Sequence, residues 1–362
     1  MRAHRIVMMK PGPPSVLRYE QHDIPAPGPH EVLVRQTAIG LNYIDIQHRT
    51  GRYPLPAYPS PIGMEAAGAV EAVGSAVGSC KPGDRVVYSS MPIGAYADLR
   101  LMPADRLVPL PPAIPDALAA AIFTKGITAH YLIHTTFAVR PGDHILVHAA
   151  AGGVGLVLCQ WAKHLDAYVI GTVGTEQKAA IARAHGCDAA IVYTQQDFVD
   201  AVIALTEGSG VPVVCDSVGK DTFAKSLRCL APRGVLVSFG TASGPVPPFD
   251  VFELNRLGSL YVTSPAFATH TKERGELLRR AGALFAAIEA GIVKIEIGRS
   301  DPLAEGHART RNCRGGAPAA PASWCREYVF CVMAGLVPAI HASFELRDVK
   351  DVDARDKRGH DG

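Results

Sequence analysis

Residues 144–165 constrain the fold of this chain more than any other segment. They begin with an apolar run suited to a β-strand, Ile145-Leu146-Val147, and then pass through a loop of small residues. From Val154 to Leu165 the apolar residues recur at the spacing of an α-helix. The segment therefore predicts a strand, a tight loop and a helix, in that order.

The loop between this strand and helix reads Ala150-x-Gly152-x-x-Gly155. It matches the dinucleotide-binding fingerprint, with Ala in place of the first Gly. Small residues there permit a tight turn, a close approach of the backbone to a pyrophosphate, and close packing of helix on strand. The N–H groups at the helix start then face the phosphates. Because all three parts occur in order, we prefer a nucleotide site to an ordinary tight turn and predict that it includes Ala150, Gly152, Gly153, Val154 and Gly155.

Beyond residue 140, strand-like apolar runs alternate with segments of helical spacing. We expect strands at 144–149, 167–171, 189–193, 211–215 and 234–239, and helices at 153–165, 175–185, 197–206 and 220–230. Strands that alternate with helices form βαβ units, which build a parallel sheet covered on both faces. The pattern predicts an α/β fold with a Rossmann doubly wound parallel sheet, extended by a strand at 259–263 and followed by a helix at 272–290.

The first 115 residues follow a different, β-rich pattern. Short strand candidates at 31–35, 68–73 and 85–88 are separated by Pro and Gly. The Pro-rich segment 53–61 cannot be a central strand, so we expect a loop there. Residues 115–134 have helical spacing and are expected to lead into the next domain.

Composition indicates a globular protein with more than one domain. A chain of 362 residues is too long for one ordinary core. Its formal net charge of +2 gives no reason to invoke nucleic acid or an acidic membrane surface. No run has transmembrane length and the start has no signal-like apolar core, so we expect a cytoplasmic protein without membrane contact. The eight cysteines form no C-x-x-C pair, so we expect free thiols.

Several segments carry a resemblance to a known family. The chain resembles quinone oxidoreductases of the zinc-free, zeta-crystallin-like branch of the medium-chain dehydrogenases in VHAAAGGVGLVLCQWAK, GTVGTEQK, CDSVGKDTFAKSL, GVLVSFGTASG, IGLNYIDIQHRTGRYP and PIGMEAAGAV. The similarity runs from about residue 3 to about residue 304. It implies a GroES-like catalytic domain at 1–125, completed by about 265–304, and a Rossmann NADPH-binding domain at 126–264. It also implies a homodimer that transfers hydride from NADPH to a small-molecule quinone.

The wider superfamily includes zinc enzymes, and a zinc site would require particular ligands in this chain. Catalytic zinc needs converging Cys, His or carboxylate ligands. Zinc relatives place Cys at the position of Asn42 and His at the position of Met64, and neither residue here is an ordinary zinc ligand. Only Cys80 precedes residue 159, so a four-cysteine zinc lobe cannot form there. We expect no metal.

The choice of nicotinamide depends on the end of the second strand of the sheet. NAD-selective folds place an acidic residue there, whereas residues 170–175 contain none. Lys178 follows in the first helical turn, and a lysine suits a phosphate; the alternative is a solvated helix residue. The resemblance implies that this Lys and the Tyr at position 193 hold the 2′-phosphate. We predict NADPH, bound in part by Gly174, Thr175, Lys178 and Tyr193.

Hydride transfer is the cofactor's own reaction, so the protein is expected to orient the substrate and stabilise its oxyanion. By resemblance, Asn42, Tyr53 and Thr128 line the nicotinamide and substrate site, with a turn Asn and a packed Tyr as the alternatives for the first two. Gln47 lies where some relatives have Tyr, which leaves substrate preference open. Carboxyl ends of parallel strands bind ligands, so we add four cofactor residues, Ser217, Phe239, Gly240 and Thr241.

Two other functions stay open from the sequence. The same hydride could reduce activated alkenes such as enals. Some zeta-crystallin relatives bind NADPH and RNA without catalysis, but the neutral charge and the lack of a basic, aromatic-rich stripe weigh against nucleic acid. The sequence does not identify the quinone or distinguish one-electron from two-electron reduction.

The resemblance stops at about residue 304, and residues 305–362 form an aberrant tail. Residues 306–323 are rich in Gly, Ala, Pro and Arg and lack core periodicity, which favours disorder. A shifted reading frame over residues 323–326 can encode Leu-Leu-Val-Pro followed by a stop codon, the ending typical of the family. We therefore interpret the tail as the product of a frameshift, with a genuine extension as the alternative.

Overall fold

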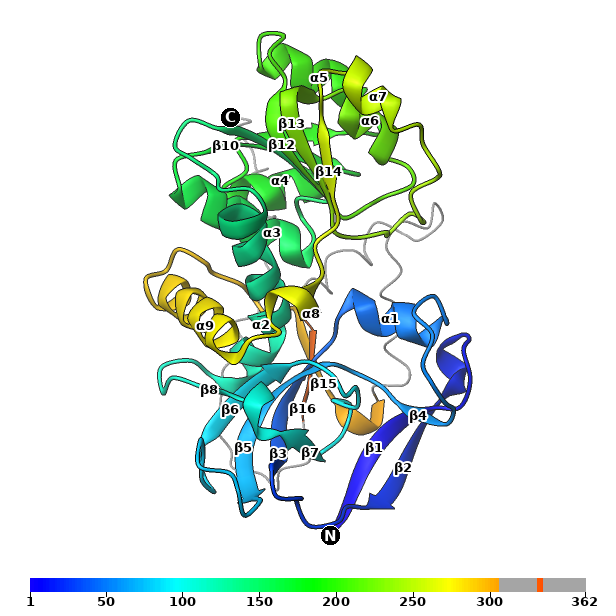
Figure 1. Ribbon diagram of the computed structural model, residues 1–362, viewed down its shortest axis with the longest axis vertical. Helices are drawn as coiled ribbons and strands as arrows, with labels where there is room; N and C mark the ends of the chain where they lie inside the picture. Colours follow the sequence, from blue (N-terminus) through cyan, green and yellow to red (C-terminus); the bar gives the residue numbers. More distant parts are fainter. Residues whose placement is uncertain (306–330, 335–362) are drawn as a thin grey trace, which may run out of the picture.

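The computed structural model describes residues 1–305 and 331–334, and Figure 1 shows two lobes joined by helices. The chain starts in the lower lobe, crosses to the upper lobe at about residue 140 and returns after residue 263. Within the described residues, no helix is both long and apolar enough to span a membrane.

The upper lobe is a six-stranded parallel sheet in the order β11-β10-β9-β12-β13-β14. Every pair of neighbouring strands in it is parallel. Its strands are β9 (His144–His148), β10 (Tyr168–Val173), β11 (Ala189–Val192), β12 (Val211–Asp216), β13 (Leu230–Ser238) and β14 (Tyr261–Thr263). Its helices are α3 (Gly153–His164), α4 (Glu176–Ala184), α5 (Phe198–Leu205), α6 (Phe223–Leu227) and α7 (Phe252–Arg256).

Both faces of this sheet are buried, as the apolar strand runs predict. Successive side chains of a strand point to opposite faces. Ile145 and Val147 of β9 accordingly belong to the cluster that includes α3 and α4 residues. Leu146, between them, belongs to the cluster that includes α5 and α6 residues. Helices therefore cover the sheet on two sides, which is the doubly wound arrangement.

The lower lobe consists of two mainly antiparallel sheets. The larger has the strand order β15-β16-β3-β5-β6-β8, with β7 also paired to β3, and the smaller has the order β2-β1-β4. The larger sheet contains β3 (Glu31–Gly40), β5 (Glu65–Val73), β6 (Arg85–Ser89), β7 (Leu99–Pro103), β8 (Val108–Pro109), β15 (Arg299–Pro302) and β16 (Cys331–Ala334). The smaller contains β1 (Arg2–Met8), β2 (Leu17–Asp23) and β4 (Ser60–Pro61).

Helices connect the two lobes through one continuous core. They are α2 (Asp116–Tyr131), α8 (Phe267–His270) and α9 (Arg274–Glu289), whereas α1 (Tyr43–Arg49) belongs to the lower lobe. Phe123 of α2 shares a cluster with Ala67 of β5 and with Val147 of β9. Where α2 crosses α9, a Cβ on Gly126 would lie 2.4 Å from a methyl carbon of Leu284. Any side chain at position 126 would force Leu284 to move, so glycine permits this close crossing of α2 and α9.

The predicted fold class is confirmed, and most elements of the upper lobe lie within a few residues of their expected positions. The helix expected at 220–230 is shorter, because α6 covers only Phe223–Leu227. In the lower lobe, the strands β1, β2, β4, β7, β8 and β15 and the helix α1 were not predicted, and β4 lies at the end of the segment that was expected to be a loop. The domain limits inferred from the resemblance stay a prediction.

Four residues of the predicted tail are part of the fold. Cys331–Ala334 form β16, which lies between β3 and β15. The strand pairs antiparallel with β3, where Met333 faces Ile39, and parallel with β15. Without β16, backbone N–H and C=O groups along β3 and β15 would lack hydrogen-bond partners. A segment without clear apolar periodicity can still provide these partners through its own backbone. The rest of the predicted tail lies outside the described residues, and the frameshift stays a prediction.

Candidate active site

The fingerprint loop has the close backbone contacts that its small residues suggest. Ala149 adopts a positive φ of 52°, and α3 begins at Gly153 directly after its N-cap Gly152. A Cβ on Gly155 would lie 2.3 Å from the carbonyl oxygen of Ala149. The turn therefore excludes any side chain at that position. The amide groups at the start of α3 emerge at the carboxyl end of β9, where a phosphate would find N–H donors and the positive end of the helix dipole.

The residues predicted to bind the 2′-phosphate lie together at the carboxyl end of β10. A Cβ on Gly174 would lie 2.9 Å from the hydroxyl oxygen of Tyr193, so these two residues are in close proximity. Thr175 is the N-cap of α4, and its hydroxyl accepts from the backbone N–H of Lys178 at 3.2 Å. Tyr193 is 54% exposed, which leaves its ring open to a ligand. The structure thus places all four residues near the carboxyl end of β10.

A second set of predicted cofactor residues lies at the ends of β12 and β13. A Cβ on Gly240 would lie 2.6 Å from the carbonyl oxygen of Ser217, so the two loops touch there. The N–H of Phe239 donates to the carbonyl of Asp216 at 2.9 Å, which keeps the strand ends in register. Thr241 follows directly and faces the lower lobe, where its carbonyl accepts from Arg52.

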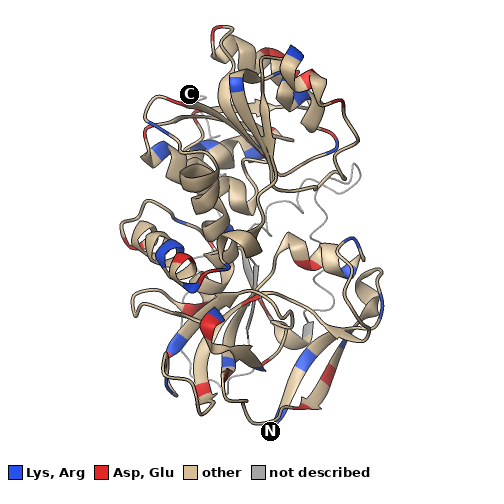
Figure 2. Ribbon diagram, in the orientation of Figure 1, with Lys and Arg blue, Asp and Glu red and all other residues tan. Residues whose placement is uncertain are grey.

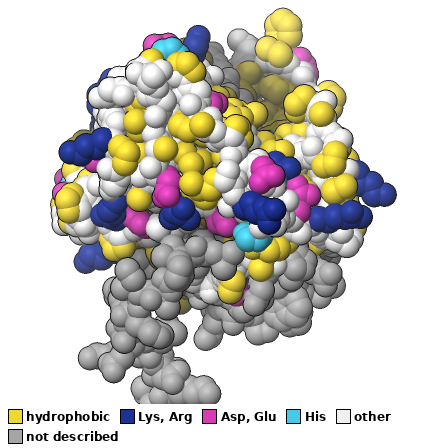
Figure 3. Space-filling view, turned by 90° about the horizontal axis from the view of Figure 1, so that it is seen from below, with side chains coloured by type: hydrophobic (Ala, Val, Ile, Leu, Met, Phe, Trp, Pro, Cys, Tyr) yellow, Lys and Arg dark blue, Asp and Glu magenta, His cyan; other side chains and the backbone are white. Residues whose placement is uncertain are grey.

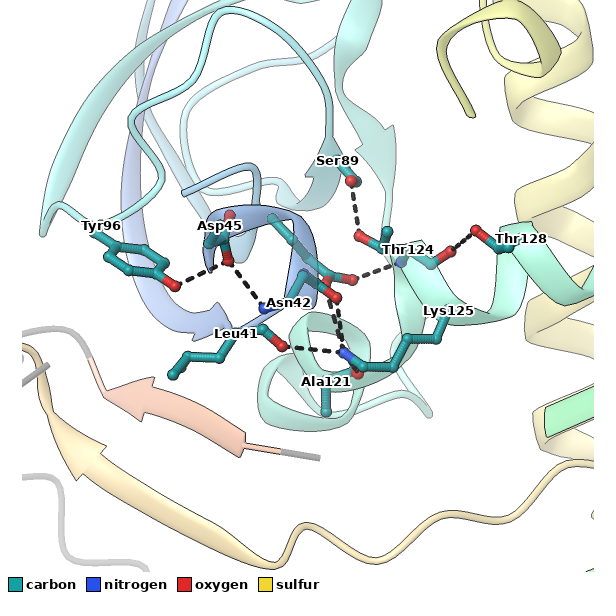
Figure 4. Close-up of polar contacts among 10 residues, drawn as sticks. Leu41, Asn42, Asp45, Ser89, Tyr96, Ala121, Thr124, Lys125 and Thr128 are labelled. Atoms are coloured by element: carbon teal, nitrogen blue, oxygen red, sulfur yellow. Dashed lines mark hydrogen bonds and ion pairs between the residues drawn. The ribbon is translucent and has the colours of Figure 1, made fainter. Parts of the chain in front are cut away.

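Asn42 lies in a polar network between α1 and α2 (Figure 4). Its side-chain Nδ2 donates to Glu65 Oε2 at 2.5 Å, and its Oδ1 accepts from Lys125 Nζ at 2.9 Å. An ammonium group only donates, and an ionised carboxylate only accepts. The amide of Asn42 is therefore held in one orientation, with its oxygen towards Lys125 and its nitrogen towards Glu65.

The network is buried and continues into α2. Glu65 is fully buried, and its Oε1 accepts from the backbone N–H of Thr124 at 2.6 Å. Lys125 also donates to the carbonyl of Ala121 at 2.9 Å and lies 4.0 Å from Glu65. Burial raises the pKa of Glu65, while Lys125 and the hydrogen bonds from Asn42 and Thr124 act in the opposite direction. Lys125 therefore stabilises the charged form of Glu65.

The three predicted catalytic residues are placed differently. Thr128 is 8% exposed and lies one helical turn after Thr124, to whose carbonyl its hydroxyl donates at 2.7 Å (Figure 4). Tyr53 is 44% exposed, and its ring centroid lies 6.1 Å from that of His48. Asn42 and Thr128 thus belong to one region around α2, whereas the ring of Tyr53 packs near His48 beyond the end of α1.

Asp45 supports Asn42 from within α1. Its Oδ2 accepts from the backbone N–H of Asn42 and from the hydroxyl of Tyr96, both at 2.9 Å. Burial raises the pKa of Asp45 to about 7, against the lowering effect of these two hydrogen bonds. Asp45 therefore fixes the start of α1 and, with it, the position of the Asn42 side chain.

The roles of Glu65, Lys125 and Thr124 were not predicted from the sequence. One signal was available: Lys125 is a single cation within the apolar stretch of α2, and an isolated buried charge is normally paired. Glu65 gave a weaker signal: it directly follows Met64, one of the two positions that were compared with the zinc ligands of relatives. No local pattern links either residue to Asn42.

Comparisons with known proteins agree with both lobes. A family model described as "Alcohol dehydrogenase GroES-like domain" matches residues 28–112, and one described as "Zinc-binding dehydrogenase" matches residues 153–283. A quinone oxidoreductase of Pseudomonas aeruginosa is 49% identical over 303 residues, which cover 84% of this chain and 93% of that protein. A 2-haloacrylate reductase of Burkholderia is 44% identical over 308 residues, covering 83% of this chain and 92% of that protein.

Solved structures give the same result at the level of the fold. The crystal structure of Escherichia coli quinone oxidoreductase complexed with NADPH superimposes with a TM-score of 0.87 and 41% sequence identity. The match covers 91% of this chain and 99% of that one.

One of the matching family descriptions names zinc, but the residues here do not fit that metal. Asn42 and Met64 stand at the ligand positions considered above, and neither provides a thiolate, imidazole or carboxylate. The ammonium group of Lys125 lies 2.9 Å from the side-chain oxygen of Asn42, where it would repel a metal cation. These residues therefore do not form a zinc site.

Proposed function

The chain belongs to the quinone oxidoreductase family of the medium-chain dehydrogenases, and from this premise we propose that it reduces quinones with NADPH and without a metal. The observation that carries the proposal is that one chain combines a dinucleotide loop at 150–155 with an amide, that of Asn42, held in one orientation. Fold alone would not specify a reaction, so the argument depends on these two sites.

The cofactor is NADPH, which supplies a hydride when bound. We propose that the fingerprint loop and the start of α3 bind its pyrophosphate. Lys178 and Tyr193 would hold the 2′-phosphate, because a lysine ammonium is a compact charge suited to phosphate and no carboxylate ends β10. Ser217 and the segment 239–241 would line the nicotinamide end.

Asn42 is proposed to stabilise the oxyanion that forms on the reduced quinone. An amide nitrogen has two N–H groups, and Glu65 accepts from this nitrogen, which leaves a second donor in a fixed direction. A preoriented donor stabilises developing negative charge without reorganisation. Thr128 and Tyr53 are proposed to line the same substrate site.

A second candidate function is the reduction of activated alkenes. It is favoured by one specific observation, the 44% identity to a 2-haloacrylate reductase over most of both chains. Reduction of such an alkene also needs a hydride and stabilisation of an oxyanion, so the same amide would serve. An RNA-binding role is not supported by the charge distribution, since basic and acidic side chains lie interspersed in Figures 2 and 3.

The deciding experiment is a steady-state assay of the purified chain with NADPH and NADH against a small quinone panel and an enal. We expect NADPH-dependent quinone reduction with a much lower kcat/KM for NADH. Turnover of the enal alone would favour the second candidate. Absence of turnover with every acceptor, despite NADPH binding, would contradict an enzymatic function.

We also propose a homodimer that forms through β14. This strand ends the parallel sheet, and Tyr261 on it is 59% exposed. Val251 and Phe252, near it in sequence, are 69% and 73% exposed. Unpaired strand edges and exposed apolar groups are typical of interfaces. Light scattering should give twice the mass of one chain, and Tyr261→Asp should shift the protein towards the monomer.

A cytoplasmic location is proposed as well. The five cysteines within the described residues 1–305 are free thiols, and four of them are buried. Reduced thiols suit a reducing compartment. Fractionation of the source cells, followed by detection of the chain in the soluble fraction, would test this location.

A further inference from the structure

A cavity of about 450 Å³ lies between α1 and the loop that follows β1. Its lining includes Tyr43 and Gln47 from α1, together with two cationic side chains, Arg49 and Arg52. None of the described residues that line it is acidic. A cavity with two guanidinium groups and no carboxylate favours an anion.

Arg52, one of the residues that line this cavity, has unused hydrogen-bonding capacity. Its Nη1 donates to the carbonyl of Thr241 at 3.1 Å, which fixes the guanidinium group. Its Nη2 is buried and has no hydrogen-bond partner among the residues that the structure describes. A buried donor without a partner is costly, and most strongly so when it is charged. A carboxylate or sulfonate would satisfy it with a charge-assisted hydrogen bond.

The cavity lies beside residues that we assign to the nicotinamide and substrate sites. Thr241 is one of the proposed nicotinamide residues, and the hydroxyl of Tyr43 donates to the carbonyl of the next residue, Ala242, at 3.2 Å. The carbonyl of Gln47 accepts from the backbone N–H of Tyr53 at 3.1 Å. The cavity is therefore flanked by the loop after β13 on one side and by a proposed substrate residue on the other.

We propose that this cavity binds the anionic group of an acidic substrate, with Arg52 as its main anchor. The substrate class is a quinone that carries a carboxylate or sulfonate. The inference rests on the proposed quinone reductase function and extends it, because a neutral quinone would bind without this anchor. Arg49 adds positive charge to the same cavity.

The test compares two quinones of similar size at saturating NADPH: menadione, which is neutral, and a naphthoquinone sulfonate. The readout is the ratio of kcat/KM for the sulfonate to kcat/KM for menadione. In Arg52→Gln this ratio should fall about tenfold or more, since the sulfonate would lose a charge-assisted hydrogen bond. Arg52→Lys, which keeps the charge, should recover part of the ratio. The control Arg35→Gln removes an exposed arginine paired with Glu71 and should leave the ratio unchanged.

Every outcome other than the expected one contradicts the inference. An equal fall for both quinones would assign Arg52 to the fold or to the contact between the lobes, which the thermal melt of the variant would show. A rise in the KM of NADPH with an unchanged ratio would assign it to the cofactor site. If the parent chain reduces menadione but Arg52→Gln does not change the ratio, the anion site is wrong and the proposed function stands. If the parent chain reduces neither quinone, both proposals fail.

Discussion

Lys125 Nζ lies 2.9 Å from Asn42 Oδ1, although the two residues are 83 positions apart in the chain. The contact joins the first helix of the lower lobe to the helix that runs between the lobes. Together with Glu65 it fixes the side chain to which we assign oxyanion stabilisation. Lys125 and Glu65 are therefore positioning residues, because they act on the substrate through Asn42.

The first prediction concerns this positioning. Lys125→Met should lower kcat by about 10–100-fold, or about 1.4–2.7 kcal/mol, because the amide of Asn42 would no longer be held in one orientation. The KM of NADPH should change little, since the cofactor loops are on the other lobe. Steady-state kinetics with a neutral quinone give both values.

Two further variants separate positioning from folding. Asn42→Ala combined with Lys125→Met should be no slower than Asn42→Ala alone, because both changes remove the same interaction. Lys163→Met, a change at an exposed lysine on α3, is the control and should leave kcat unchanged. Additive losses in the double variant would show that Lys125 acts independently of Asn42.

The second prediction concerns cofactor choice. Lys178→Ala should raise the KM of NADPH about tenfold, or about 1.4 kcal/mol, because the 2′-phosphate would lose its cation. NADH has no 2′-phosphate, so its KM should hardly change. Equal losses with the two cofactors would mean that Lys178 supports α4 rather than the phosphate.

The upper lobe could be predicted well because its signals are local. Ile145 and Val147 face one side and Leu146 the other, so a strand buried on both faces appears as an apolar run. Gly155 is required by contacts with Ala149, only six residues away. Such features depend on residues that are close together in the sequence, so they can be recognised without any knowledge of the tertiary structure.

The network around Asn42 could not be predicted in the same way. Its members come from the start of α1, from β5 and from α2, and only the packing of α2 against the lower-lobe sheet brings them together. The sequence suggested Asn42 by resemblance but gave no partner for its amide. For β16 the reason is different: its place depends on the free edges of β3 and β15, which no property of its own four residues reveals.

The third prediction follows from the pKa of Asp45, which burial raises to about 7 from an ordinary value of 3.8. Between about pH 4 and pH 7 the folded state then binds more protons at this site than the unfolded state. The free energy of unfolding should therefore decrease as pH rises through this window. Asp45→Asn keeps the shape but cannot ionise, so its thermal melts should depend less on pH. A parent and a variant with identical pH profiles would contradict this prediction.

The fourth prediction concerns metal. Dialysis of the purified chain against a strong chelator should leave NADPH-dependent quinone reduction unchanged, because the donor set at Asn42 and Met64 does not suit zinc. Elemental analysis before dialysis should find no stoichiometric zinc. One zinc per chain, lost together with activity, would overturn the argument from these two residues.

The last prediction concerns β16. A chain that ends after Glu305 loses β16 and leaves backbone groups of β3 and β15 without their partners. Each backbone hydrogen bond contributes about 0.5–1.5 kcal/mol, so this chain should melt several degrees lower than one that ends after residue 334. Exposed strand edges also promote association, so light scattering should show more aggregation.

A frame-restored chain that ends in Leu-Leu-Val-Pro provides the comparison with the family ending. If its terminal strand occupies the position of β16 with a better apolar pattern, it should melt higher than the chain ending after residue 334, because buried aliphatic side chains contribute about 1.5–3 kcal/mol each. If the chain ending after residue 334 is the most stable of the three, the segment up to β16 is a genuine part of the fold and the frameshift interpretation is wrong. If the chain ending after Glu305 melts as high as the others, β16 contributes nothing to stability.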